Sequence, residues 1–553
     1  MIQLGLSAFY HDSAACIVVD GKVIAAAEEE RFTQTKHDSS FPVNAIAFSL
    51  SKAGIKDIND IDEVCWYERP EDKEKRVLKM FNRHWFKTFF LRRKFKKEFK
   101  LNDPKYLLSQ HFNYEGKIKY LPHHVSHAAF SYYTSKYKDA GILTVDGVGE
   151  EQTITISKGT GKNITLLKEI NFPNSLGMYY SAMTSFLGFK PNEGEYKVMG
   201  LAAWGDHTKF LHKLGQVFID VPGGFEINLK FFPWEYTDQI MFNKRLSRIL
   251  QLPNRLPEDE LTQEHKDLAA TVQFLYQVYF LKLVKITKEL TQSENLCLSG
   301  GCAYNGVANG KAYTYFKSIH VPFAPSDAGS AIGACLYSNN KVRKNNTSPF
   351  LGPSYDNERI EQAIRYHTND IKVYRLREDK LLKRVAEIIH SGRIVSWFQG
   401  AMEFGARALG NRSILATPLD GNMTKKLNAI IKKREGFRPF APSIIEEEAG
   451  TYFDMKEPSP YMSLVVPVKT KELKAITHVN NSARVQTVNK NFNPRYYKLL
   501  KQMKAVSGHP VVLNTSFNLK DQVITMEPER ALQRFLSSEM DALVIDNFLI
   551  LKK

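Results

Sequence analysis

Short apolar runs separated by glycine-bearing turns open the chain. The segment IQLGLSAF (2–9) predicts a strand, residues 10–13 form a polar loop, and AACIVVDGKVIAAAEEERF predicts two more strands joined at Asp20-Gly21. Asp-Gly between alternating apolar runs favours a hairpin because both residues accept positive φ. The same order of strand, polar glycine loop and hairpin recurs between residues 141 and 170. The repeat predicts a duplicated α/β domain in which the two loops face each other across a cleft.

The remaining pattern alternates helices and strands. Residues 265–340 predict a long helix, the strand NLCLSGG, a second helix, a loop carrying Asp327 and a helix of small residues. The polar stretch SNNKVRKNNTSPFLGPSY predicts a linker with a domain boundary near residue 345. Beyond it we expect further helices and strands, with a long irregular region between MTKKLNAIIKK and HPVVLNTSFN. The predicted fold class is α/β: a duplicated actin-like (ASKHA-type) domain at 1–345 and a second α/β domain at 346–553.

Composition places the chain among globular proteins of more than one domain. Its 553 residues exceed what one core supports, and five cysteines without a CxxC pair give neither a disulfide framework nor a zinc finger. The N-terminal residues lack a signal-peptide pattern, and we find no window of about 18 apolar residues. We therefore expect a cytoplasmic protein.

The net charge of +17 is concentrated in one segment. Residues 73–100 hold 12 Lys/Arg against two Glu, a surplus of ten, interleaved with phenylalanines and a tryptophan. Such a mixture fits a helix on a membrane surface, a site for a large amphipathic substrate, or a solvated helix with a buried aromatic stripe. All three stay open. Because the other cations are scattered, we expect no nucleic-acid partner.

The stretch LPHHVSHAAF, followed by GILTVDGVG, predicts a metal site. His123 and His127 share a face of a helix at i and i+4, and Asp146 follows a buried strand. Asp327, between small residues, is a plausible fourth ligand. Two imidazoles with carboxylate oxygens suit iron, manganese or zinc. The alternative is that both histidines are ordinary half-buried side chains.

Other loops carry groups suited to acid–base chemistry and to anions. His11 with Asp12 lies in the first polar loop and can act as a base toward a hydroxyl, and Gly300-Gly301 can bring backbone N–H groups to a phosphate. Arginine pairs bidentately with phosphate or carboxylate, so separate arginine loops in the second domain predict a small anion held from several sides. They are EFGARALGNRS (Arg407, Arg412), REGFRPFAPS (Arg434, Arg438) and NNSARVQTV (Arg484), joined by NTSFN after the strand VVL.

Motifs along nearly the whole chain resemble those of the NodU/CmcH family of O-carbamoyltransferases. They are HDSAA, AAAEEERF, KHDSSFP, HHVSHAA, TVDGVGE, SLGMYYSAMTSFLGF, GEYKVMGLAAWG, SGGCAYNGVAN, APSDAGSAIGA, EFGARALGNRSILA, REGFRPFAPS, ARVQTV and NTSFN. The resemblance implies a YrdC-like second domain that makes carbamoyl-adenylate from carbamoyl phosphate and ATP, with Mg²⁺. It also implies an actin-like first domain that passes the carbamoyl group to an acceptor hydroxyl at a site holding Fe²⁺ or a similar divalent metal.

The same resemblance implies roles for individual residues. His11 with Asp12 would be the base of transfer, and the metal ligands would be His123, His127, Asp146 and Asp327. Contacts to the adenylate would come from Lys36, Gly300, Gly301 and Asn305, and contacts to carbamoyl phosphate and ATP from Arg407, Lys432, Arg438, Arg484, Asn514 and Ser516. The chain departs from the family at Ala406, commonly proline, which makes that loop less rigid. It also has Asn480, Asn481 and Ser482 where Asp-Gly-Thr is usual, so a carboxylate that could bind metal or Mg²⁺ is missing there.

We therefore expect an ATP-dependent O-carbamoyltransferase. One alternative is a tRNA threonylcarbamoyl-type transferase, which would need a basic groove across both domains; the concentration of charge in one aromatic-rich segment disfavours it. The other is a non-catalytic nucleotide sensor, which the retained His11, metal residues and arginine loops disfavour. The acceptor is a small molecule, a glycan or a natural product such as an antibiotic, and its identity is not readable. Membrane contact through 73–100 and a homodimer are left open.

Overall fold

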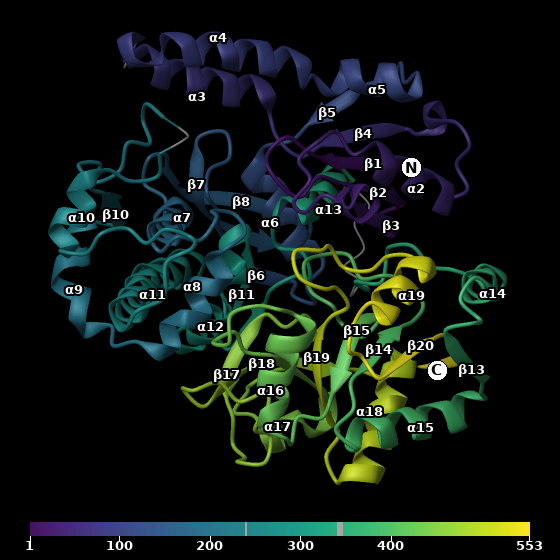
Figure 1. Ribbon diagram of the computed structural model, residues 1–553. Helices are drawn as coiled ribbons and strands as arrows, with labels where there is room; N and C mark the ends of the chain where they lie inside the picture. The colour runs from purple at the N-terminus through teal and green to yellow at the C-terminus, as the bar shows by residue number, and fades with distance from the viewer. Residues whose placement is uncertain (84, 238–239, 340–346) are drawn as a thin grey trace. The chain divides into compact units, whose positions relative to one another are not determined.

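The computed structural model describes the chain except residues 84, 238–239 and 340–346 (Figure 1). It divides into two compact units, which are described separately. The first comprises Met1–Glu29 with His37–Thr347, and the second comprises Glu30–Lys36 with Ser348–Lys553. The boundary expected near residue 345 lies outside the described residues, so the two predicted domains remain a prediction.

Two five-stranded sheets with the same strand order form the frame of the first unit. In the first sheet the order is β3-β2-β1-β4-β5, and in the second it is β8-β7-β6-β11-β12. In the first sheet, β1 pairs antiparallel with β2 of the hairpin and parallel with β4. In the second sheet, β6 likewise pairs antiparallel with β7 and parallel with β11. The duplicated actin-like fold is therefore confirmed. The strands are β1 (Ile2–Ser7), β2 (Ala14–Val19), β3 (Lys22–Glu28), β4 (Glu63–Trp66), β5 (Ile118–Tyr120), β6 (Asp139–Val145), β7 (Gln152–Thr160), β8 (Asn163–Asn171), β11 (Asn295–Ser299) and β12 (Ser318–His320).

Helices α6 (His123–Tyr133) and α13 (Asp327–Ser338) pack closely against each other because α13 is built from small residues. A Cβ on Gly333 would lie 1.9 Å from the carbonyl oxygen of Ser126 in α6, so only glycine fits there. The remaining elements of this unit are α2 (Val43–Lys52), α7 (Leu176–Phe186), α8 (Glu195–Leu201), α9 (Thr208–Leu214), β9 (Phe218–Val221), β10 (Gly224–Ile227), α10 (Lys244–Leu250), α11 (Gln263–Thr291) and α12 (Gly306–Lys311).

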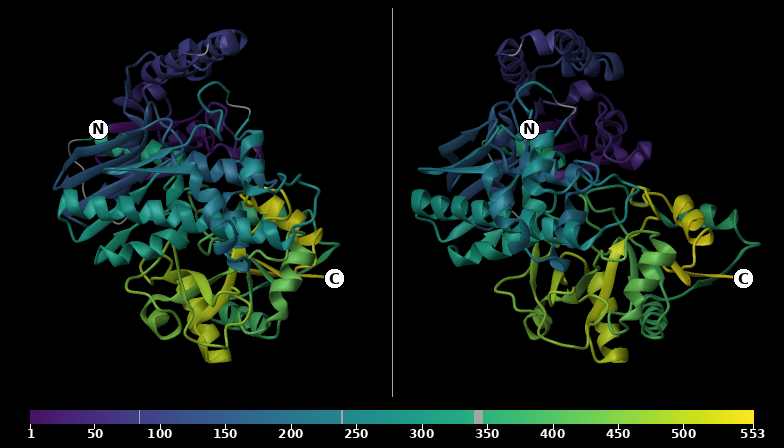
Figure 2. Two further views of the ribbon diagram at one scale, coloured as in Figure 1. Left: turned by 90° about the vertical axis from the view of Figure 1, so that its left-hand side faces the viewer. Right: turned by 60° about the vertical axis from the view of Figure 1, so that its left-hand side comes forward.

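The basic aromatic segment folds as two helices, α3 (Pro70–Arg83) and α4 (Trp85–Leu101), followed by α5 (Pro104–Phe112). Figures 1 and 2 show α3 and α4 side by side at the margin of the first unit. Phe81 is buried and its ring meets that of Phe95 edge-on, with centroids 5.9 Å apart. These two aromatics therefore pack between the helices, while the cations of α4 include exposed side chains at Arg92, Arg93, Lys96 and Lys97.

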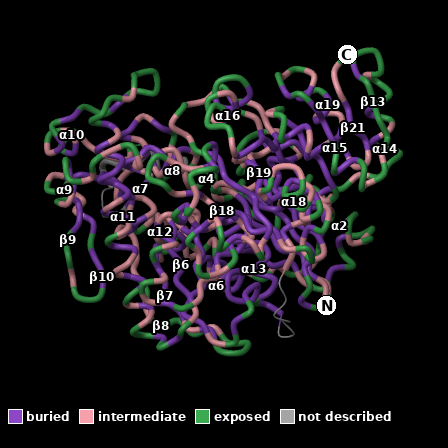
Figure 3. The backbone as a smooth tube through the Cα atoms, turned by 90° about the horizontal axis from the view of Figure 1, so that it is seen from below, coloured by how far each residue is buried: buried purple, intermediate pink, exposed green. Residues whose placement is uncertain are grey.

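A nine-stranded mixed sheet forms the second unit, in the order β13-β21-β20-β14-β15-β19-β16-β18-β17. Its core gathers Trp397, Leu415 and Leu499 among other fully buried side chains. Figure 3 colours most of the backbone at the strands labelled β18 and β19 as buried. The strands are β13 (Ile371–Arg375), β14 (Val395–Phe398), β15 (Arg412–Ala416), β16 (Ala441–Ile445), β17 (Leu464–Pro467), β18 (Ser482–Val488), β19 (Val511–Ser516), β20 (Ala542–Ile545) and β21 (Phe548–Lys552). The helices are α1 (Glu30–Thr33), α14 (Asn357–Arg365), α15 (Glu378–His390), α16 (Asn422–Lys426), α17 (Ala449–Tyr452), α18 (Pro494–Ser507) and α19 (Pro528–Leu536). The predicted α/β class is confirmed for this unit as well.

Two features of the second unit differ from the sequence prediction. The region expected to be irregular contains β16, β17 and β18, which are short strands next to proline and polar residues. The early segment Glu30–Lys36 also belongs to this unit. Arg31 donates from Nη2 to the carbonyl of Gly405 at 3.0 Å, and Phe32 packs on Met402 and Met526. Of the described helices, none has the length and apolar character that crossing a bilayer needs.

Candidate functional site

Four predicted ligands meet inside the first unit. His123, His127, Asp146 and Asp327 are all buried, and one ligand atom from each lies within 4.8 Å of the others. Nε2 of His123 lies 3.0 Å from Oδ2 of Asp146 and 3.1 Å from Nε2 of His127. Nε2 of His127 lies 3.3 Å from Oδ1 of Asp327. The sequence had suggested this grouping from residues 200 positions apart, and the fold brings them together.

Each ligand is placed by the end of an element. The histidines occupy the first and fifth positions of α6, and Asp146 directly follows β6. Asp327 is the first residue of α13, so it is not in a loop as the sequence suggested. The Gly300-Gly301 turn positions the carboxylate of Asp146, because the N–H of Gly301 donates to Oδ1 of Asp146 at 2.9 Å. Gly300 has φ +85°, and a Cβ there would lie 2.2 Å from the carbonyl of Val145.

The cluster fits a divalent metal. Donor atoms about 2.1 Å from a common ion stand roughly 3.0–3.4 Å apart, close to the separations found here. Oδ2 of Asp327 is buried without a partner among the described residues, and the Nε2 atoms of His123 and His127 face each other at 3.1 Å. Both features are expensive unless a cation sits between the groups. Ser330 contacts Nδ1 of His127 at 2.9 Å, which fixes that ring with Nε2 toward the cluster.

In the cluster, burial and the nearby charges shift the pKa values of the side chains in opposite directions. Burial by itself lowers the pKa of His127, but Asp146 and Asp327 outweigh it and raise this pKa to about 9. Burial likewise opposes ionisation of Asp146, but hydrogen bonds to His123 and His127 hold the pKa of its carboxyl well below the usual range. The carboxylate of Asp146 therefore stays charged at neutral pH, as a metal ligand must.

His11 takes part in a chain of three side chains. Oδ2 of Asp12 lies 2.9 Å from Nδ1 of His11, and Oδ1 of the same carboxylate lies 2.7 Å from Nδ1 of His37. Burial lowers the pKa of His11, but Asp12 overrides it and raises the pKa to about 10. The ring therefore presents Nε2 away from Asp12. His37 was missed from the sequence, although the motif KHDSSFP was the available signal.

The loop of His11 lies close to the cluster of His123, His127, Asp146 and Asp327, hereafter the metal-type cluster. The rings of Tyr10 and His11 lie 4.8 Å apart, and a Cβ on Gly147 would lie 3.5 Å from the hydroxyl of Tyr10. Gly147 directly follows Asp146, so the loops after β1 and β6 approach each other. The first unit thus brings together a histidine with a carboxylate partner and a set of metal ligands.

Lys432 is the centre of a cationic cluster in the second unit. The side chain is buried, and its Nζ donates to the carbonyls of Ser516 and Asn518 at 2.6 and 2.9 Å and to Oδ1 of Asn518 at 2.7 Å. Burial lowers the pKa of Lys432 well below its usual range, and the charges of Arg434 and Arg438 lower it further. Cations held this close favour an anion beside them.

The loop that carries Arg407 is held by hydrogen bonds from two buried side chains. Oε1 of buried Glu403 accepts the backbone N–H groups of Leu409 and Asn411, both at 2.7 Å. Asn514 donates from Nδ2 to the carbonyl of Ala408 at 3.2 Å, so its amide supports this loop from within. Ala406 itself is exposed, and these hydrogen bonds lie on the residues that follow it, so the lower rigidity expected at this position stays a prediction.

Several residues that were predicted to contact an anion or the adenylate lie in surroundings that differ from the prediction. Arg412 opens β15, is fully buried, and donates to backbone carbonyls including those of Gln399 and Pro353, so it is a structural residue. Arg484 lies within β18 and not in a loop. Asn305 pairs its amide with Gln273 and caps α12. Lys36 is exposed.

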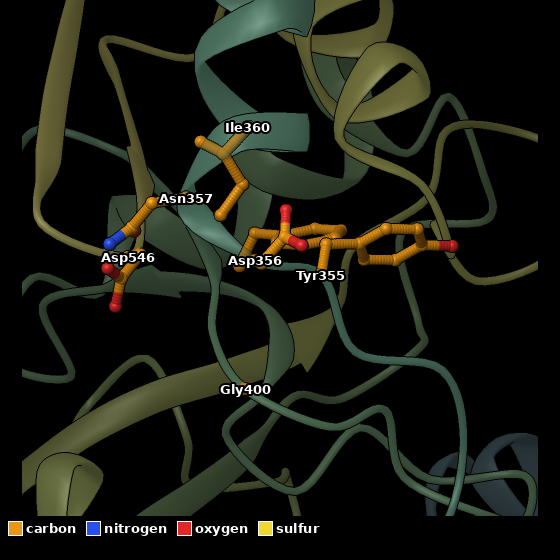
Figure 4. Close-up of a pocket in the computed structure, with 7 residues that line it drawn as sticks. Tyr355, Asp356, Asn357, Ile360, Gly400 and Asp546 are labelled. Carbon is orange, nitrogen blue, oxygen red and sulfur yellow. The ribbon is translucent and has the colours of Figure 1, made fainter. Parts of the chain in front are cut away.

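A pocket of about 320 Å³ opens in the second unit at the carboxyl ends of the parallel strands β14 and β20. Figure 4 shows Tyr355, Asp356, Asn357 and Ile360 around it, with Asp546 across from Tyr355. Asp546 is ion-paired with Arg495 at 2.6 Å. None of the predicted site residues lines this pocket.

Comparisons with known proteins agree with the sequence resemblance. Residues 2–336 match the family described as carbamoyltransferase N-terminus, and residues 386–552 match carbamoyltransferase C-terminus. The chain is 40% identical to an uncharacterized protein of Synechocystis, covering 99% of this chain and 96% of that one. It is 34% identical to the nodulation protein NolNO of Sinorhizobium fredii, covering 99% of this chain and 79% of that one. It is 30% identical to the 3'-hydroxymethylcephem-O-carbamoyltransferase of Amycolatopsis lactamdurans, covering 59% of each.

Proposed function

Because the chain belongs to the carbamoyltransferase family, we propose that it is an ATP-dependent O-carbamoyltransferase that uses carbamoyl phosphate. In the second unit, carbamoyl phosphate and ATP would give carbamoyl-adenylate, phosphate and pyrophosphate, with one water consumed. In the first unit the carbamoyl group would pass from the adenylate to an acceptor hydroxyl, releasing AMP. The observation that carries this proposal is the cluster of His123, His127, Asp146 and Asp327 beside the His11 loop.

His11 would accept the proton of the acceptor hydroxyl as that oxygen attacks the carbamoyl carbon. Asp12 would orient the ring through Nδ1 and stabilise the imidazolium that forms, while His37 would hold the other oxygen of Asp12. A divalent metal, when bound by the four-residue cluster, would supply positive charge for oxygen atoms of the adenylate or the attacking group. The adenylate makes a good carbamoyl donor because AMP is a stable leaving group.

The cations of the second unit would bind the phosphate groups of carbamoyl phosphate and ATP. Lys432 is supported by its burial beside the positive charges of Arg434 and Arg438. Arg438, which also pairs with Glu435 at 3.3 Å, is supported by its place in that cluster, and Arg407 by the hydrogen-bonded loop that presents it. Mg²⁺ would accompany ATP as it does in most phosphoryl and nucleotidyl transfers. The acceptor would be a hydroxylated small molecule, as the name of the cephem-modifying relative suggests, or a glycan.

Mass spectrometry tests the proposal. The purified protein is incubated with ATP, carbamoyl phosphate, a divalent metal and a panel of hydroxylated sugars and natural products. We expect one acceptor to gain one carbamoyl group, and the gain to require both ATP and carbamoyl phosphate. Transfer that proceeds without ATP would rule out the adenylate route.

A further inference from the structure

Arg76, on the helix α3, is a cation that the rest of the protein leaves without an ion pair or hydrogen bond among the described residues. Its Nε is buried and has no hydrogen-bond partner there. The guanidinium lies over the ring of Phe172, with Cζ 5.5 Å from the ring centroid. The residue as a whole is half-buried, so the guanidinium is partly withdrawn from water without being sealed off. A desolvated guanidinium is costly unless an acceptor binds it.

Two neighbouring cations of the same helix, Lys73 and Lys75, have acidic partners. Nζ of Lys73 donates to both carboxylate oxygens of Glu68, at 3.0 and 3.1 Å. Lys75 pairs with Asp72 at 2.9 Å and is well exposed. Glu68 and Asp72 are therefore already engaged by other cations. Arg76 differs from both in having no ion pair among the described residues.

The strand order places the start of α3 on the same edge as the metal-type cluster. Strands β1 and β4 are parallel, with Leu6 beside Trp66, so their following loops leave the sheet together. In the loop after β4, the hydroxyl of Tyr67 donates to the carbonyl of Ala8 at 3.0 Å, and its ring lies 5.2 Å from that of His123. The N–H groups of Arg69 and His123 share Oε1 of Glu150.

Charge effects agree with this placement. Burial lowers the pKa of Arg76, while the negative charges of Glu68 and Glu150 act against that decrease. Burial raises the pKa of Tyr10, the residue next to His11, and the positive charge of Arg76 partly opposes that increase. Arg76 therefore lies within electrostatic reach of the His11 loop and of the residues that position His123.

We propose that Arg76 binds an oxyanion, a phosphoryl or carboxylate group, on a molecule held at the His11 loop and the metal-type cluster. The planar guanidinium presents two parallel N–H groups that match two oxygens of such a group, and its Cζ lies over the ring of Phe172. The identity of that molecule rests on the proposed function: the oxyanion belongs either to the adenylate phosphoryl group or to an anionic acceptor. Arg76 would then select among acceptors or fix the donor, without exchanging protons.

Chemical modification tests this site without requiring turnover. The full-length protein is treated with phenylglyoxal, which reacts with accessible guanidinium groups, and the modification of Arg76 is followed by peptide mass spectrometry. AMP, glucuronic acid and neutral glucose are added separately. We expect at least one of the two anions to slow the modification of Arg76 by about tenfold, the change that corresponds to one charge-assisted contact, while glucose does not. The exposed Arg93 on α4 serves as the internal control.

Every outcome of this experiment is decisive. Protection by AMP assigns the oxyanion to the adenylate, protection by glucuronic acid assigns it to the acceptor, and protection by both indicates a shared site. If neither anion protects Arg76, or if Arg93 is protected equally, the inference is wrong. Because no carbamoyl transfer is measured, protection of Arg76 would still be seen in a protein that transfers no carbamoyl group, so failure of the proposed function can be told apart from failure of this inference.

Matched variants supply an independent readout. We expect Arg76→Gln to raise KM for the bound anion about tenfold or more while adenylate formation in the second unit is unchanged, and Arg76→Lys to recover part of the loss. Lys75→Gln, which removes an exposed, paired cation of the same helix, should leave KM unchanged. An equal effect of Lys75→Gln and Arg76→Gln would indicate helix packing instead.

Discussion

At the scale of single residues, the state of His11 is set by the carboxylate beside it. Asp12 raises the pKa of His11 against the opposing effect of burial, and Asp146 and Asp327 add smaller contributions of the same sign. The imidazole must be neutral to accept a proton. A raised pKa therefore means that the neutral form of His11 predominates only at higher pH. A bound cation beside Asp146 and Asp327 would reduce their part of the shift.

We therefore predict that Asp12→Asn moves the acid limb of the carbamoyl-transfer pH profile to lower pH. The sign follows because removing the negative charge leaves burial, which favours the neutral ring. The maximal rate should fall as well, since Asn no longer stabilises the imidazolium. The measurement is the pH dependence of transfer with metal present, and a limb that moves to higher pH would contradict the assigned role of Asp12.

Ser330 provides a second prediction at this scale. Its hydroxyl contacts Nδ1 of His127 at 2.9 Å, and it is fully buried. Loss of such an orienting contact lowers metal affinity about 10–100-fold. Ser330→Ala should therefore weaken metal binding in a titration monitored by elemental analysis. Ser131→Ala is the control, because that buried hydroxyl donates to a carbonyl within α6; equal losses in both variants would count against the metal site.

At the scale of elements, the loop that carries Arg407 depends on one carboxylate. Glu403 accepts backbone N–H groups of Leu409 and Asn411 in a fully buried position, so truncation leaves those donors unsatisfied. We predict that Glu403→Ala lowers the free energy of unfolding of the protein by roughly 2–5 kcal/mol. Glu403→Gln retains an acceptor oxygen and should cost less. Urea denaturation followed by circular dichroism compares them, and equal stability of both variants would refute this account of the loop.

The helix α4 carries the other prediction at this scale. Phe81 and Phe95 pack between α3 and α4, which leaves Arg92, Arg93, Lys96 and Lys97 as an exposed basic face. Each cation near an anionic surface contributes on the order of 1 kcal/mol. We expect co-sedimentation with anionic vesicles at low salt that neutral vesicles, high salt or neutralisation of these four residues abolishes. Sedimentation that does not change with salt or with the four substitutions would leave α4 as a solvated helix.

The elements were predictable where periodicity was strong. Both hairpin units, the helix of His123 and His127 and the helix at Asp327 follow from alternating or small-residue patterns. The strands β16 to β18 were not predictable, because β16 contains Pro442 and β18 mixes buried and half-buried positions. Contacts such as Asp12 with His37, or Arg412 with backbone carbonyls, depend on tertiary folding that no local pattern encodes.

At the scale of the whole molecule, the two units carry different chemistry. The first combines histidines and carboxylates suited to a metal and to proton transfer, and the second combines Lys432 with arginines suited to phosphate groups. The chain matches the carbamoyltransferase family over both regions. We therefore expect two half-reactions that can be separated by substitution, adenylate formation in one unit and carbamoyl transfer in the other.

The most direct test follows carbon-13 from labelled carbamoyl phosphate through the native protein, His11→Ala and Arg438→Ala. Arg438→Ala should lose adenylate formation and pyrophosphate release, because it removes a charge-assisted contact of roughly 1.5–3 kcal/mol. His11→Ala should still form carbamoyl-adenylate and release pyrophosphate, but should deliver no label to the acceptor. If folded His11→Ala formed no carbamoyl-adenylate, or if Arg438→Ala retained full transfer, the division of the reaction between the two units would be wrong.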